Sequence, residues 1–268
     1  MLEFCPPINT YAFEFKDDLT KFGNLVVTRH EEKMDILMRS RISEFMCFYI
    51  KSTSGNVIAC SVVSNVDYHR PILLRCHQNG TDIGDEFSNL YEFAQDLDCS
   101  IITFDYSGYG QSSGIATENN ILNDIESVLK CLKKYFHISF KNLFLLGESI
   151  GSVPAIHGAT LYEDLGGLIL MSAFISAFEI VFSYKGKPLA GDSLQNLQRI
   201  SLVKCPILLI HGLEDTVISA EHSRRLFKAS PTAVELLLVP EATHEYISFF
   251  NTVRSRIKLF ISNYSSTD

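Results

Sequence analysis

A chain of 268 residues suits one α/β domain of ordinary size, and its 46% of hydrophobic residues is enough to form a buried core. The formal net charge of −8 argues against nucleic acid as a main partner and against purely electrostatic attachment to an anionic membrane, because both need clustered Lys and Arg. Seven cysteines, without a C-x-x-C pair, predict a reducing compartment with neither a disulfide framework nor a zinc site.

The first forty residues are mixed and polar, and we interpret residues 1–40 as an irregular N-terminal extension before a domain that spans residues 41–268. Met1–Pro7 has neither a basic nor a long apolar stretch, so we expect no secretory signal.

From residue 41 onward, short apolar runs alternate with helical patterns. Glu44–Ile50 and Val57–Val63 predict a β-hairpin that turns at Ser54-Gly55-Asn56. The other expected elements are strands at Pro71–Cys76, Ser100–Phe104, Leu143–Gly147, Leu168–Ser172, Pro206–His211 and Val234–Val239, and helices at Asp85–Leu97, Asn119–Tyr135, Ile150–Leu161, Ala220–Ala229 and Tyr246–Ile261.

Buried strands that alternate with helices predict an α/β fold, with a mostly parallel central sheet, helices on both faces and an antiparallel N-terminal edge. The apolar stretch Gly166–Tyr184 is long enough to suggest a membrane span. Glu179 interrupts it, however, and its beginning fits a buried strand, so we expect no span there.

Residues Gly147–Gly151, with the sequence GESIG, match the G-x-S-x-G pattern of a nucleophilic serine. The serine of that pattern lies on a sharp turn from strand to helix, where the residues two before and two after must be small. Here the pattern follows a predicted strand and begins a predicted helix. We therefore expect Ser149 to be a nucleophile, and the alternative is a Gly-Ser turn that only joins strand to helix.

The acid and base that activate such a serine follow it in chain order. Asp215 and Glu214 both come after the predicted strand Pro206–His211, and we favour Asp215; the alternative is an Asp that caps the next turn. His244 lies in a loop after the last strand, whereas His222 belongs to a polar, solvated helix face. We expect His244 to take the serine proton and Asp215 to fix its tautomer.

Negative charge that develops on the substrate carbonyl oxygen needs N–H donors, each of which contributes about 3 kcal/mol. Ile150, the residue after the nucleophile, can provide one of these donors. The second is expected from the loop His77–Gly80, where we favour the N–H of Asn79 over that of Gly80. The alternative is a simple turn at the end of the strand.

Other patterns predict no cofactor and no metal. Gly108–Gly114 resembles a dinucleotide loop, but its third Gly is one position late for G-x-G-x-x-G. The His-Glu pairs that begin at His30 and His244 lack the second His of a zinc-binding H-E-x-x-H motif. The histidines that precede the acid, including His77, His157 and His211, are expected to be structural.

Several segments together resemble the subgroup-seventeen members of the α/β-hydrolase domain-containing proteins, from about Phe4 to the last helix. The resemblance implies an α/β-hydrolase fold with Ser149, Asp215 and His244 as its catalytic triad and no cofactor. The segments that carry it are Phe4–Pro7 with Thr10-Tyr11, Phe104–Gly110, Gly147–Gly151 and His211–Ile218.

The chain differs from that family at three places. It has His77-Gln78-Asn79 where the family has His-Gly-Asn, and Glu148 where the family has Gln before the nucleophile. It also offers only Cys5 where the family has an N-terminal cluster of cysteines that carry lipid. A single lipid chain anchors a protein weakly.

Members of that family remove palmitoyl groups from cysteines of membrane-associated proteins. The resemblance therefore implies a cytoplasmic thioesterase that acts on S-acylated proteins or on small acyl esters and thioesters, with peripheral contact at the cytoplasmic face of membranes. Residues 173–200 are expected to form a lid-like insertion over the acyl site, or alternatively to pack on the core. The other readings are a carboxylesterase or lipase, a serine peptidase, or a non-catalytic ligand-binding homologue.

Overall fold

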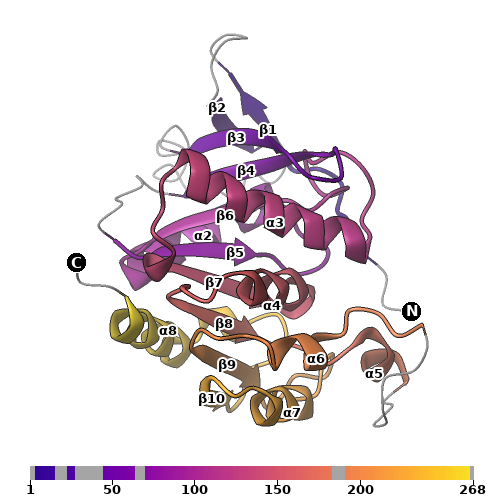
Figure 1. The fold of residues 1–268 in the computed structure, drawn as a ribbon, viewed down its shortest axis with the longest axis vertical. Helices are drawn as coiled ribbons and strands as arrows, with labels where there is room; N and C mark the ends of the chain where they lie inside the picture. Colours follow the sequence, from indigo (N-terminus) through magenta and orange to yellow (C-terminus); the bar gives the residue numbers. More distant parts are fainter. Residues whose placement is uncertain (1–3, 16–22, 28–44, 64–69, 183–190, 266–268) are drawn as a thin grey trace. The chain divides into compact units, whose positions relative to one another are not determined.

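The structure is a computed structural model that describes residues 4–15, 23–27, 45–63, 70–182 and 191–265 (Figure 1). The chain divides into an N-terminal unit, Phe4–Ile138, and a C-terminal unit, Ser139–Asp268. Each unit contains its own strands and helices.

The sheet of the N-terminal unit has the order β1-β2-β3-β4-β6-β5. Its neighbours pair antiparallel except β5 and β6, which are parallel. The predicted hairpin is confirmed, because Met46 pairs with Val62 and Gly55 takes a φ of 91° in the turn. The strands are β1 (Tyr11–Glu14), β2 (Gly23–Val27), β3 (Met46–Lys51), β4 (Val57–Val63), β5 (Ile72–Cys76) and β6 (Ser100–Phe104).

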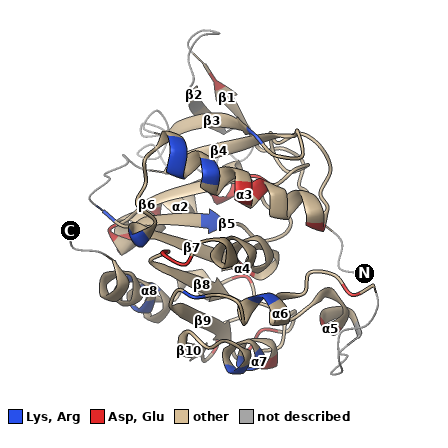
Figure 2. Cartoon of the chain, in the orientation of Figure 1, with Lys and Arg blue, Asp and Glu red and all other residues tan. Residues whose placement is uncertain are grey.

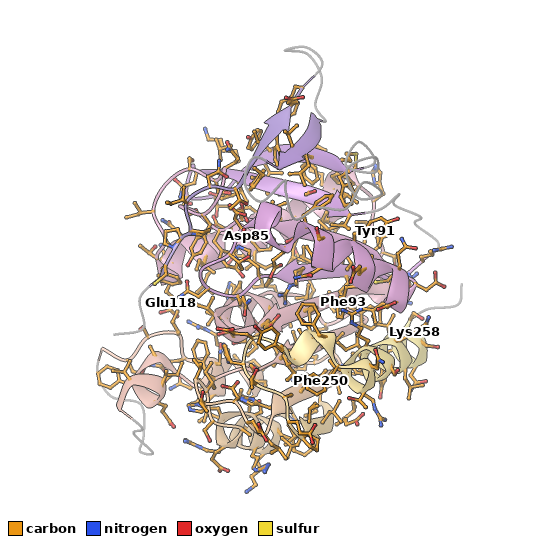
Figure 3. All side chains as sticks on the ribbon, turned by 180° about the vertical axis from the view of Figure 1, so that it is seen from behind. Asp85, Tyr91, Phe93, Glu118, Phe250 and Lys258 are labelled. Atoms are coloured by element: carbon orange, nitrogen blue, oxygen red, sulfur yellow. The ribbon has the colours of Figure 1, made fainter. Side chains whose placement is uncertain are left out.

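Two amphipathic helices, α2 (Ile83–Leu97) and α3 (Glu118–Tyr135), cover opposite faces of this sheet (Figures 1 and 3). Asp82 caps α2 by accepting a hydrogen bond from the N–H of Asp85, and Thr117 caps α3 in the same way. Helix α3 also carries acidic residues towards its first turn and lysines in its last, which complements the helix dipole (Figure 2).

Hydrogen bonds fasten the first residues of the described chain within the N-terminal unit. Thr10 N–H donates to Asp82 Oδ2 over 2.9 Å, and the Tyr11 hydroxyl donates to Asp105 Oδ2 over 2.6 Å. Asp105 is fully buried and also accepts the N–H of Ile83. Burial raises the pKa of Asp105 well above its usual value, despite the hydrogen bond from Tyr11.

The C-terminal unit has a parallel sheet in the order β7-β8-β9-β10. Its strands are β7 (Leu143–Glu148), β8 (Gly167–Met171), β9 (Ile207–Gly212) and β10 (Ala233–Val239). Helices α4 (Ser152–Leu161), α6 (Asn196–Ile200) and α7 (Glu221–Ala229) lie on one side of this sheet, and α8 (Asn251–Tyr264) lies on the other (Figures 1 and 3). Every residue of β7, β8 and β9 is buried, as expected for parallel strands with helices on both faces.

Two sequence predictions of secondary structure are wrong. Residues 1–40 are not irregular throughout, because β1 and β2 form an antiparallel pair. The sequence did not predict these strands because they are too short to show a clear alternating pattern. The last helix begins at Asn251 rather than Tyr246, because a 3₁₀ turn at Ile247–Phe249 and an extended Phe250 precede it. The predicted boundary at residues 40–41 lies outside the described residues.

The apolar stretch Gly166–Tyr184 contains strand β8 and the short helix α5 (Ala177–Phe182). Among the described residues, no helix has both the length and the apolar character needed to cross a membrane. Phe174 and Ile175 are buried, whereas Val181 is 39% exposed. The core-packing alternative therefore applies to the start of residues 173–200. The side chain of Phe182 and residues 183–190 lie outside the described part of the chain, so the lid stays a prediction.

Candidate active site

Ser149 lies at a sharp turn where β7 passes into α4 through the 3₁₀ turn Ser149–Gly151. Its φ of 52° falls in the left-handed region, which is uncommon for a residue with a side chain. A Cβ atom on Gly147 would lie 2.5 Å from the carbonyl oxygen of Gly151 and 2.7 Å from Cβ of Ala155. The glycine before the turn is therefore required for the helix to pack closely on the strand end.

The structure brings Ser149, His244 and Asp215 together within the C-terminal unit. His244 Nε2 lies 3.1 Å from Ser149 Oγ, and His244 Nδ1 lies 2.7 Å from Asp215 Oδ2. The Asp215 side chain has no solvent exposure, and the His244 side chain retains 12%. A serine hydroxyl, an imidazole and a buried carboxylate are thus connected in one line, as nucleophilic acyl transfer requires.

Asp215 uses its two carboxylate oxygens for different purposes. Oδ1 accepts the N–H groups of Val217, at 2.9 Å, and Ile218, at 2.7 Å, while Oδ2 faces His244. The capping role and the triad position, which the sequence presented as alternatives, therefore occur in the same side chain. The exposed Glu214 instead donates its backbone N–H to the carbonyl of Ala242.

Sequence reasoning missed a second histidine, His211, in contact with Asp215. His211 is fully buried at the end of β9, and its Nε2 lies 3.3 Å from Asp215 Oδ2 and 2.8 Å from the carbonyl of Ile218. Burial acts to raise the pKa of Asp215, but hydrogen bonds from His211, His244 and the Ile218 N–H outweigh it and hold the pKa well below its ordinary value. The carboxylate is therefore charged at neutral pH.

The loops that carry Asp215 and His244 are packed directly on each other. The N–H of Leu213 donates to the carbonyl of Val239, and a Cβ on Gly212 would lie 2.1 Å from the carbonyl oxygen of Ala242. Only a glycine allows the chain after β9 to approach the chain after β10 so closely. This approach places Asp215 within reach of His244.

The two predicted oxyanion donors belong to different units. Ile150 is buried in the turn that follows Ser149. Asn79 lies in the loop after β5, where its side-chain oxygen accepts the N–H of Cys5 over 2.9 Å and the hydroxyl of Tyr109 over 2.6 Å. The left-handed residue of that loop is Gly80, with a φ of 75°, so the loop does not require Gly at position 78. The pairing of Asn79 with Ile150 stays a prediction.

The remaining candidates have other surroundings. His222 does not belong to a fully solvated face: its Nδ1 accepts the N–H of Ile175 over 3.2 Å, and burial lowers its pKa. His77 is buried and stacks on Tyr106 with 4.1 Å between ring centroids. Within the described part of the chain, no group of three or more His, Cys, Asp or Glu side chains is arranged to hold a metal ion.

Comparison with known proteins identifies the family. The chain is 34% identical to human α/β hydrolase domain-containing protein 17B over 97% of its length and 89% of that protein. It is 31% identical to the α/β hydrolase domain-containing protein aho-3 of Caenorhabditis elegans, over 97% of this chain and 76% of that one. The chain belongs to the α/β-hydrolase domain-containing protein 17 family. The family resemblance noted in the sequence is thereby confirmed, and the family is one of hydrolases.

Other comparisons agree on the fold. Residues 70–191 match a family model described as serine aminopeptidase, S33. An esterase from Pyrococcus furiosus superposes with a TM-score of 0.68 at 18% identity, over 82% of this chain and 93% of the esterase. The predicted α/β-hydrolase fold, mostly parallel with an antiparallel N-terminal edge, is confirmed. The segment matched by the family model includes Ser149 and ends before Asp215 and His244.

Proposed function

We propose that this hydrolase is a serine thioesterase that removes long-chain acyl groups, such as palmitoyl, from cysteines of S-acylated proteins, with Ser149 as nucleophile, His244 as base and Asp215 as orienting acid. The observation that carries the proposal is the hydrogen-bonded series from Ser149 Oγ through His244 to Asp215 Oδ2. The choice of a thioester substrate rests on the family resemblance carried by the motifs of the sequence, and membership of that family supports it.

The reaction begins when Ser149 Oγ attacks the thioester carbonyl carbon and His244 Nε2 takes its proton. The oxyanion that forms is stabilised by the N–H of Ile150 and, in this proposal, that of Asn79. The carbon–sulfur bond then breaks, the thiolate takes the proton from His244, and the acyl group remains on Ser149. Water attacks this ester with His244 again as base, which releases the fatty acid and restores Ser149.

Exposed apolar side chains on the two triad loops support an acyl substrate. Leu213 and Val217, on either side of Asp215, are 49% and 60% exposed, and Tyr246 and Phe249, which follow His244, are 61% and 45% exposed. Large apolar side chains exposed on the loops that carry Asp215 and His244 favour binding of apolar groups. Each methylene of an acyl chain that they cover adds about 0.8 kcal/mol of binding.

The same surroundings suit a substrate protein held at a membrane, so we propose that the enzyme works at the cytoplasmic face of membranes through peripheral contact. The acidic net charge of −8 gives an anionic lipid surface little electrostatic attraction for it. Contact would therefore depend on apolar side chains and on the acylated substrate.

A peptidase is the second candidate, because the matching family model is described as a serine aminopeptidase. The two reactions differ at the leaving group. A cysteine thiolate, whose conjugate acid has a pKa of about 8.5, leaves readily, whereas an amine must receive a proton from the catalytic histidine as it leaves. Turnover of matched thioester, ester and peptide substrates by the same preparation separates these readings.

The decisive experiment compares wild type with Ser149→Ala on a palmitoyl thioester and on a short-chain ester. We expect the substitution to lower turnover on the order of a millionfold, because it removes the nucleophile, with the melting temperature nearly unchanged. Ser201→Ala, which alters an exposed serine in a turn, is the matched control and should behave as wild type.

A fluorophosphonate probe provides an independent measurement on the same proteins. It should label wild type and Ser201→Ala but not Ser149→Ala. Residual turnover above a few per cent in Ser149→Ala would reveal another nucleophile, and an unlabelled wild type would favour a non-catalytic binding protein. Turnover of peptides but not thioesters would favour the peptidase.

A further inference from the structure

Asn196, the first residue of α6, is fully buried in the C-terminal unit. Its Nδ2 donates to the carbonyl of Phe174 over 2.9 Å and to Ser152 Oγ over 3.0 Å. Its backbone N–H donates to the carbonyl of Ile175 over 2.7 Å. Asn196 therefore joins the two ends of residues 173–200 to each other and connects them to the first residue of α4, the helix beside which α6 lies (Figure 1).

The chemistry of the partners sets the direction of these hydrogen bonds. The carbonyl of Phe174 can only accept, so the Asn196 side chain must present its amide nitrogen. Ser152 Oγ lies 2.6 Å from the carbonyl oxygen of Ser149 and donates its single proton there. Ser152 Oγ must then accept from Asn196. The donors run in one order, from Asn196 to Ser152 and from Ser152 to the backbone of the nucleophile.

These hydrogen bonds fix the orientation of the peptide plane between Ser149 and Ile150. The carbonyl of Ser149 accepts both the N–H and the hydroxyl of Ser152. Because a trans peptide is planar, its C=O and N–H point in opposite directions, and a carbonyl that is held fixes the direction of the N–H of the next residue. That residue is Ile150, whose N–H is the proposed oxyanion donor.

We propose that Asn196 and Ser152 are positioning residues that direct the Ile150 N–H at the oxyanion, and that they couple the chain at Phe174 and Ile175 to the chemical step. Ser149 occupies a left-handed conformation that its surroundings must hold, and these two side chains are part of what holds it. Since Asn196 also donates hydrogen bonds to the carbonyls of Phe174 and Ile175, a displacement of these two residues would turn the oxyanion donor. The inference rests on the proposed function.

Ile175 and Glu179 are also held by side chains of α7. Glu179 forms a two-pronged ion pair with Arg225, and Ile175 donates its N–H to His222. Arg225 and His222 lie three residues apart, on one side of the helix. These contacts hold Ile175 and Glu179 without reaching Ser149, whereas the hydrogen bonds of Asn196 reach the backbone of Ser149 through Ser152.

The test uses Asn196→Ala and Ser152→Ala, with Ile200→Val as the matched control. Ile200 is buried in the same short helix and makes no polar contact with Ser152 or Ser149 that the structure records. For each variant, kcat and KM are measured on a short-chain and a long-chain acyl ester, and active enzyme is counted by titration with a fluorophosphonate. The inhibition constant of a trifluoromethyl ketone, whose serine adduct carries an oxyanion, is measured in parallel.

A misdirected oxyanion donor should lower kcat by tenfold to about a hundredfold on both chain lengths, with little change in KM. The inhibition constant of the ketone should rise by the same factor. The pH dependence should keep its midpoint, because the Ser149–His244–Asp215 contacts remain. Ile200→Val should keep the kcat of wild type per active site.

Three results would overturn the inference. In Ser152→Ala, a kcat per active site equal to that of wild type would show that the hydroxyl has only a structural role. Ser152→Ala also tests the inference if Asn196→Ala does not fold. A loss confined to long-chain substrates would assign Asn196 to acyl binding. Residual turnover in Ser149→Ala would instead overturn the proposed function, and the positioning role with it.

Discussion

Replacement of Asp215 by Asn tests the triad through the two separate tasks of this carboxylate. Oδ1 accepts two backbone N–H groups, those of Val217 and Ile218, so the amide oxygen of the substituted side chain must remain at that position. The amide nitrogen then replaces Oδ2 and donates to His244 Nδ1. His244 is forced into the tautomer with its proton on Nε2, facing Ser149 Oγ, and it cannot accept the serine proton.

The expected loss in kcat of Asp215→Asn is about ten-thousandfold at neutral pH, which corresponds to about 5.5 kcal/mol of transition-state stabilisation. The side chain keeps its size and both backbone N–H contacts but loses the acceptor that faces His211 and His244, so the melting temperature should fall, by much less than the rate suggests. The assay is turnover of an acyl thioester at neutral pH, normalised to folded protein. Glu214→Gln is the matched control, because Glu214 is exposed and adjacent in sequence, and its activity should stay within about twofold of wild type.

The reasoning would be refuted by either of two results. A loss below tenfold in Asp215→Asn would mean that the tautomer of His244 is not set by this carboxylate. A larger loss in Glu214→Gln than in Asp215→Asn would show that the acid was assigned to the wrong residue.

Two further predictions concern stability. Gly147→Ala should lower the free energy of unfolding by about 1–3 kcal/mol and abolish turnover, since its Cβ would lie 2.5 Å from the carbonyl oxygen of Gly151; a wild-type denaturation midpoint in urea would contradict the packing argument. Burial raises the pKa of Asp124 from 3.8 to about 6, although hydrogen bonds from Ser107 act to lower it. The folded state therefore holds this proton at higher pH than the unfolded state, and stability should fall by up to about 3 kcal/mol between pH 4 and pH 6 on this account. Asp124→Asn should lack that contribution, and parallel stability profiles of the two proteins over pH 4–7 would refute it.

The sequence predicted most of the fold because the signals for these elements are local. The buried strands are continuous apolar runs bounded by Gly, Pro or polar residues, and β4 and β6 lie at the predicted residues. β1 and β2 were missed because they consist of only a few residues each and are defined by pairing rather than by pattern. The displaced start of α8 depends on the extended Phe250, which no local breaker residue announces.

The sequence predicted candidate site residues where a motif marks the nucleophile, as at Ser149, and where the acid and the base follow the nucleophile in a fixed chain order. The contact of His211 with Asp215 arises only after the chain turns back beyond β9, so a histidine inside an apolar strand gave no functional signal. The hydrogen bond between Asn196 and Ser152 joins residues 44 positions apart, and Asn196 belongs to no motif. A contact of this kind is set by tertiary packing, and only coordinates reveal it.

The hydrogen bond between Tyr11 and Asp105 has a consequence for the order in which the chain can assemble during synthesis. The two residues are 94 positions apart, so the ribosome must release the entire segment through β6 before the tyrosine hydroxyl finds its acceptor. Until then β1 lacks part of its final contacts. Closing so long a loop costs conformational entropy, and the contacts that local segments form early do not compensate for that cost. Within the N-terminal unit, β1 should therefore dock later than its place in the chain suggests, and a fusion directly ahead of β1 should slow maturation more than a fusion after α8.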